Sequence, residues 1–104
     1  MIYNKKLLET MIEVDYASSM GGVCRGPIDF GIYNKLKGRI RKHLVPVIDN
    51  LVSMSDSELL KFGNELAEVG VKSHTYSYSA GHFSHDAESV RDLIELCEET
   101  CGEI

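Results

Sequence analysis

A chain of 104 residues with 43% hydrophobic content has the composition of one globular domain, 1–104, which buries roughly 65% of its unfolded surface on folding. No apolar run approaches the ~20 residues that a membrane-spanning helix needs, and no signal peptide is visible. Three cysteines do not favour a disulfide framework, so we expect a cytoplasmic protein with reduced thiols and no membrane partner. The net charge of −5 argues against general affinity for nucleic acid but not against a local basic patch.

The first periodic segment predicts an amphipathic helix that begins near Tyr3 and ends near Ala17. Charged residues lie on its wetter side. Its apolar positions include two adjacent pairs, Leu7/Leu8 and Met11/Ile12. We interpret this segment as one packed helix of a small bundle rather than as a partner-binding face.

A glycine-rich segment, 18–27, then breaks the helical pattern. Glycines can turn backbone amides towards an anion, and Arg25 would add a cation beside them. Their spacing matches neither a Walker loop nor a dinucleotide fingerprint, and Asp29 would repel a phosphate at the next helix. We therefore favour a connecting loop. An anion-binding site is the alternative, and its residues would be Gly21, Gly22 and Arg25.

Segment 29–52 is the central element that we expect. Its apolar residues recur at helical spacing, and Asp29 caps its start. Pro46 lacks a backbone donor and clashes with the preceding turn, which predicts a kink or break just before it. Five of the eleven Lys and Arg residues of the chain lie in this segment: Lys35, Lys37, Arg39, Arg41 and Lys42.

The third predicted helix has the clearest local signals. Ser55 and Glu58 form a capping box, and Met54 and Leu59 occupy the positions of a hydrophobic staple. Gly70 predicts the end of this helix, since glycine tolerates the left-handed conformation. The segment also faintly resembles a helix-turn-helix with Gly70 in the turn. We do not favour that motif, because the residues that follow are poor helix formers.

Residues 73–79 alternate between hydroxyl side chains and tyrosines, which is typical of a strand. We therefore expect a short β hairpin or extended loop near 73–85, which must pack on the helices to be stable. Asp86 then caps a last helix. The predicted fold class is mainly α: a small single-domain helical bundle of about four helices with this short hairpin.

Two cysteines of the last helix, Cys97 and Cys101, have the composition of a zinc site when taken with His82 and His85. A continuous helix would hold His85 and Cys97 about 18 Å apart along its axis. Ligands of one zinc ion lie ~2.0–2.3 Å from it, so the four residues cannot share an ion within one chain. We expect both cysteines in the core, with no metal and no cofactor.

The predicted helices carry opposite charges. Segment 29–52 has five basic and two acidic side chains, giving +3, whereas 86–104 has seven acidic residues and Arg91, giving −6. Either the two helices pack side by side and neutralise each other, or they present their faces to different partners. The sequence leaves both arrangements open.

Small size and charged helical faces favour a non-enzymatic interaction protein: a regulator, adaptor or inhibitor that binds a larger protein partner. The partner-binding residues would be Lys35, Lys37, Arg39, Arg41 and Lys42. One alternative is a nucleic-acid-binding protein that uses the basic helix 34–43. A second is small-molecule or phosphate-ligand binding through the glycine-rich loop 21–27. The adjacent apolar pairs favour a homodimer, because one small bundle does not readily cover both members of each pair.

Overall fold

The computed structural model describes residues 4–19, 28–72 and 86–104, and every regular element in these ranges is a helix. The predicted mainly α fold of about four helices is therefore confirmed. The hairpin predicted near 73–85 and the glycine-rich loop 21–27 lie outside the described residues. The elements in chain order are α1 (Lys5–Ser19), α2 (Phe30–Arg39), η1 (Ile40–Leu44), η2 (Val45–Val47), α3 (Ile48–Val52), α4 (Asp56–Lys72) and α6 (Ala87–Gly102).

Polar side chains cap the helix starts. Asn4 Oδ1 accepts the backbone N–H three residues later at 2.9 Å, and Asp29 and Asp86 each accept the N–H two residues later at 2.9 Å. The predicted capping box is present: the Ser55 N–H donates to Glu58 Oε1 at 3.1 Å, and the Glu58 N–H donates to Ser55 Oγ at 3.4 Å. These bonds satisfy amides that have no partner inside their own helices, which fixes where the helices begin.

Pro46 interrupts the long segment, as predicted. After α2, the chain passes through a π turn in η1, where the Val45 N–H donates to the Ile40 carbonyl, and then through a 3-10 turn in η2. A proline ring clashes with the carbonyl four residues earlier in a regular α-helix, and the widened turn relieves that clash. Ile40 and Leu44 are both fully buried, since residues four apart lie on one face of a helix.

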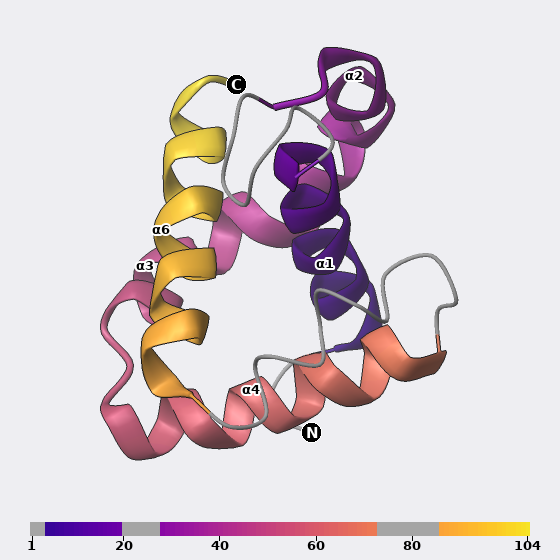
Figure 1. The fold of residues 1–104 in the computed structure, drawn as a ribbon. Coiled ribbons are helices and arrows are strands. Elements are labelled where there is room, and N and C mark those ends of the chain that lie inside the picture. Colours follow the sequence, from indigo (N-terminus) through magenta and orange to yellow (C-terminus); the bar gives the residue numbers. More distant parts are fainter. Residues whose placement is uncertain (1–3, 20–27, 73–85) are drawn as a thin grey trace.

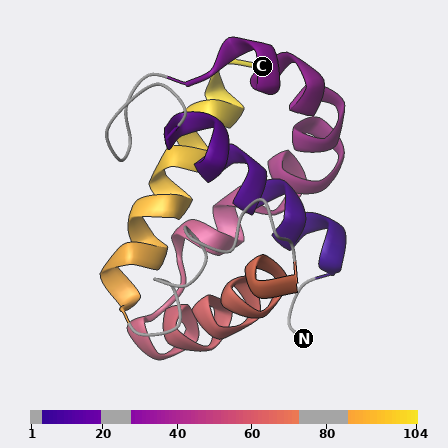
Figure 2. The ribbon, with the colours of Figure 1, turned by 45° about the vertical axis from the view of Figure 1, so that its right-hand side comes forward.

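The helices enclose one hydrophobic cluster. α1 and α6 contact each other, and α4 packs against both of them (Figure 1). The C-terminal end of α6 lies beside the start of α2 in both views (Figures 1 and 2). No helix of the described residues combines the length and the hydrophobicity that crossing a membrane requires. The most deeply buried large side chains are Phe62, Leu7, Leu8, Met11, Ile12, Ile40, Leu44, Leu51, Leu59, Leu66, Leu93 and Val14.

Gly70 does not end its helix, because α4 continues to Lys72. The glycine cap predicted at this position is therefore wrong, and so is a helix-turn-helix with its turn there. A glycine inside a helix costs about 1 kcal/mol relative to alanine. The helix before it buries Phe62, Leu66 and Val69 in the core. Each such side chain contributes about 1.5–3 kcal/mol, which outweighs the cost of one glycine.

Candidate functional site

The five basic side chains of the α2–η1 segment do not share one face. Residues three, four or seven apart lie on the same side of a helix. Lys35, Arg39 and Lys42 therefore turn to one side, and Lys37 and Arg41 turn to another. Four of the five residues are exposed to solvent, and the exception, Arg39, is only partly exposed.

Arg39 is tied to α1. Its Nη1 donates a hydrogen bond to Glu13 Oε2, and its Nη2 lies 4.0 Å from Glu9 Oε2. The side chains of Arg39 and Glu13 are 37% and 15% exposed, so the pair is better shielded from water than a fully solvated one. Arg39 therefore joins two helices of the fold, and the exposed cations of this segment are Lys35, Lys37, Arg41 and Lys42.

Phe30 and Lys37 cover Tyr33 on the other side of α2. The Phe30 and Tyr33 rings meet edge to face, with centroids 6.2 Å apart and planes at 82°. Lys37 Nζ lies 5.8 Å from the centroid of the Tyr33 ring, within range of a cation–π contact. Tyr33 is 5% exposed, whereas Phe30 is 66% exposed. We call Phe30, Tyr33 and Lys37 the Tyr33 platform.

The Tyr33 hydroxyl fixes the platform to the end of α6, because it donates to the Thr100 carbonyl at 3.4 Å. Burial raises the pKa of Tyr33 above its usual value of 10.0, the negative charge of Glu103 raises it further, and the positive charge of Arg41 opposes both. The phenol therefore stays neutral at physiological pH. Charges of both signs act on this one ring, which makes the surroundings of the platform electrostatically mixed.

Phe30 is the part of the platform that sequence periodicity did not indicate. Tyr33 falls on the apolar repeat of segment 29–52 and is buried. The available signal was the position of Phe30, which directly follows the Asp29 cap and precedes Lys37 by seven residues, or about two turns. An aromatic residue that the apolar stripe does not require is informative, because large exposed apolar groups often mark contact surfaces.

The cysteines of α6 do not form a disulfide. Cys97 is fully buried, as predicted for a core residue, whereas Cys101 is only partly buried. Burial raises the pKa of the Cys101 thiol to about 11, with a further contribution from the charge of Glu98. Within the described residues, no group of three or more His, Cys, Asp or Glu side chains is arranged to hold a metal ion. The anion site predicted at Gly21, Gly22 and Arg25 lies outside them.

The oppositely charged helices make ion pairs with other parts of the fold. In the basic segment Arg39 pairs with α1, and in the acidic helix Arg91 Nη2 lies 2.5 Å from Asp56 Oδ1 at the start of α4. The remaining cations around the Tyr33 platform and most of the carboxylates of α6 face solvent. Function has to be inferred from these surfaces, since no protein-family model, no curated protein and no solved structure matches the chain.

Proposed function

We propose that the chain is a non-enzymatic interaction protein, a small regulator, adaptor or inhibitor, that binds a larger protein partner through the Tyr33 platform. The observation that carries the proposal is the 66% exposure of Phe30 beside a buried tyrosine and a cation. Aromatic and arginine side chains are enriched among the residues that dominate the binding energy of protein interfaces. The partner would supply an apolar recess for Phe30 and carboxylates for Lys37 and Arg41.

The platform would supply part of the energy that specific binding needs. Full burial of a phenylalanine side chain contributes roughly 1.5–3 kcal/mol, so covering the exposed two thirds of Phe30 would contribute about 1–2 kcal/mol. The ring is already held against Tyr33, so little side-chain entropy is lost when a partner covers it. Lys37 is held over the same ring, which pre-organises one cation beside the apolar anchor.

Capture experiments with matched variants test this proposal. The parent chain and the variants Phe30→Ala and Lys37→Glu are immobilised, and proteins retained from an extract of the native host are quantified by mass spectrometry. Leu60→Ala and Lys61→Glu are the controls, since both residues are exposed on α4 and receive the same chemical change. We expect at least one protein to fall about tenfold or more with both platform variants and to stay unchanged with both controls. Equal retention by all five chains would refute the proposal.

Nucleic-acid binding through the basic segment is the second candidate function, and the exposure of Lys35, Lys37, Arg41 and Lys42 favours it. A long polyanion would also meet Glu103 beside the platform and a chain of net charge −5. A protein partner can present carboxylates only where the cations lie, whereas a nucleic acid carries charge along its whole length. The mixed surroundings of the platform therefore favour a protein partner.

A salt titration separates the two functions. Lys35, Arg41 and Lys42 are changed together to Glu, while Arg39 is left in place because its loss would also disturb the contact with α1. If the protein binds duplex DNA specifically, its affinity should fall with salt by a log–log slope of about −0.9 per phosphate contact, and the triple variant should not bind. We expect weak binding by the parent chain at physiological salt. Tight, salt-sensitive binding that the triple variant loses would reverse the ranking.

We further propose a cytoplasmic location and self-association. The thiols of Cys97 and Cys101 support a reducing compartment, because disulfides persist mainly in oxidising ones. Self-association is supported by large apolar side chains that remain exposed away from the platform. These are Val45 and Val52, which are 42% and 48% exposed.

A further inference from the structure

The outer face of α6 is mainly acidic, with Arg91 as the one cation among its exposed carboxylates. Glu88, Glu95 and Glu99 are exposed, and their spacing of seven and four residues places them on one side of the helix. Glu98 and Glu103 are exposed nearby. Two such faces would repel each other, so this surface suits a cationic partner rather than a second α6.

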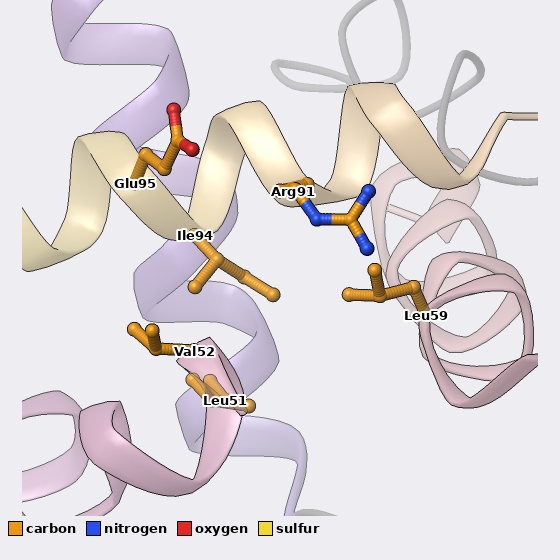
Figure 3. Close-up of a pocket in the computed structure, with 6 residues that line it drawn as sticks. All are labelled: Leu51, Val52, Leu59, Arg91, Ile94 and Glu95. Carbon is orange, nitrogen blue, oxygen red and sulfur yellow. The ribbon is translucent and has the colours of Figure 1, made fainter. Parts of the chain in front are cut away.

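A small pocket opens beside this acidic face, between α3, α4 and α6 (Figure 3). Its volume is about 80 Å³, and Val52 at its edge is 48% exposed. A cavity of about 150 Å³ holds a benzene molecule, so this pocket suits a branched aliphatic side chain rather than an aromatic ring. Arg91 at the rim is paired with Asp56, and Glu95 also lines the pocket, so these three side chains together give its surroundings a net negative charge. The lining residues are Leu51, Val52, Leu59, Arg91, Ile94 and Glu95.

The chain itself carries a group with the complementary chemistry. Val45, at the start of η2, is a branched aliphatic residue that is 42% exposed. Arg41 precedes it by four residues, about one helical turn, and is also exposed. An aliphatic anchor with a cation one turn away matches an apolar pocket with a carboxylate at its mouth. Lys42 adds a second exposed cation to the same turn.

We propose that the α6 pocket of one copy receives Val45 of a second copy, with Arg41 of the second copy opposite Glu95. The contact joins the basic η1 region of one molecule to the acidic α6 face of another, so unlike charges meet. This contact rests on the proposed self-association, leaves Phe30 and Lys37 outside the interface, and goes beyond the proposed binding of a larger protein. The contact pairs two different surfaces. It therefore forms twice in a twofold dimer, and it repeats from copy to copy in a longer assembly if the copies are not related by a twofold axis.

Charge exchange between two variants tests this contact. Sedimentation equilibrium is measured for the parent chain, for Arg41→Glu, for Glu95→Lys and for an equimolar mixture of the two variants. We expect the parent to self-associate and each variant alone to associate at least about tenfold more weakly, because like charges then face each other. In the mixture, the two substituted side chains carry opposite charges and meet at one contact, while the unchanged Arg41 and Glu95 meet at the other. Association should therefore return to about the level of the parent.

A second pair of variants tests the apolar anchor. Val45→Ser should weaken association several-fold, since the pocket loses its aliphatic occupant. Leu60→Ser changes an apolar side chain of similar exposure on α4 and should leave association unchanged. The thermal unfolding of each variant is recorded to establish that it is folded at the temperature of the measurement.

Three outcomes would overturn the proposal. They are a parent chain that stays monomeric at every concentration, variants that associate as well as the parent, and a mixture that associates no better than its components. If association is lost with Leu60→Ser instead, a different face of the molecule is used. Phe30→Ala should not change self-association, and Glu95→Lys should not change capture of the larger partner. Both proposals use Arg41, and the variants Phe30→Ala and Glu95→Lys therefore separate the failure of one from the failure of the other.

Discussion

At the scale of single residues, side-chain oxygens decide where the described helices start. Ser55 and Glu58 satisfy each other's backbone amides, and the backbone N–H of Ser55 and its hydroxyl together lower the pKa of Glu58. The carboxylate form is therefore favoured by folding. This contribution is present above the pKa of Glu58 in the unfolded chain and is lost as the pH falls through the lower pKa of the folded chain.

Replacing Ser55 by alanine should lower the free energy of unfolding by about 1 kcal/mol, because an amide at the start of α4 loses its acceptor. Urea denaturation at pH 7 measures this change. Asn64→Ala is the control, since Asn64 is an exposed polar residue further along α4 and away from the cap. An unchanged midpoint for Ser55→Ala would show that this cap contributes nothing to stability.

Cys101 should react slowly with alkylating reagents. Its pKa of about 11 is two units above the usual 9.0, so its thiolate is about a hundredfold scarcer at pH 8 than that of an ordinary thiol. Iodoacetamide labelling followed by peptide mass spectrometry should show this rate difference, and unfolding in urea should abolish it. Because the folded pKa is raised, the stability that the neutral thiol contributes is lost between about pH 9 and pH 11. Rapid labelling of Cys101 in the folded protein would contradict this.

At the scale of elements, the long segment of α2, η1, η2 and α3 is interrupted near Pro46 by a π turn and a 3-10 turn. The sequence predicts that the segment breaks there, but not which turns form. Pro46 predicts an interruption of the helix, because its ring cannot fit a regular helical turn. The π turn before it has no comparable signal in the sequence. Asp29, Ser55 and Asp86 were recognisable as caps because their bonds are local.

The two errors at helix ends differ in origin. Gly70 is a good local stop signal, yet α4 runs through it to Lys72, in a helix whose earlier turns bury Phe62, Leu66 and Val69 in the core. A local signal worth only about 1 kcal/mol does not end such a helix. At the start of α1 the apolar pattern around Tyr3 suggested an earlier beginning, and the local cap at Asn4 sets the boundary instead.

Gly38 offers a stabilising substitution within α2. A methyl group added at this position meets no atom within 4 Å, and the residue lies inside a helix and is exposed. Gly38→Ala should therefore raise the free energy of unfolding by about 0.5–1 kcal/mol, chiefly by restricting the unfolded chain. A rise in the thermal midpoint, with capture of the partner unchanged, is the expected result. A fall in the midpoint would show that α2 is strained by the substitution.

At the scale of the whole molecule, every helix of residues 4–19, 28–72 and 86–104 contributes to one hydrophobic cluster. If one helix detached from this cluster, apolar side chains of its neighbours would be exposed to water. Unfolding should therefore be a single cooperative transition. Differential scanning calorimetry tests this, with an expected ratio of calorimetric to van't Hoff enthalpy of about one. A ratio well above one, or separate transitions for different helices, would contradict the assignment of one domain to residues 1–104.

The composition of the candidate surface was visible in the sequence, whereas its arrangement was not. The concentration of basic residues in 34–43 was evident, and four of the five proved exposed. Helical spacing placed Lys35, Arg39 and Lys42 on one face. It did not show that Arg39 forms an ion pair with Glu13 on α1. That ion pair depends on how α1 and α2 pack, and so does the support that Tyr33 gives to Phe30.

The exposed ring of Phe30 also provides a place for an optical reporter. The chain contains no tryptophan, so Phe30→Trp would introduce a single indole at the centre of the proposed contact surface. The larger ring keeps an aromatic edge against Tyr33, and it stays largely in water until a partner covers it. Its emission should shift to shorter wavelength on binding, because the indole moves into an apolar environment, and buried Tyr33 would act as a nearby energy donor. Binding to the Tyr33 platform could then be followed in solution by fluorescence, without labelling either protein.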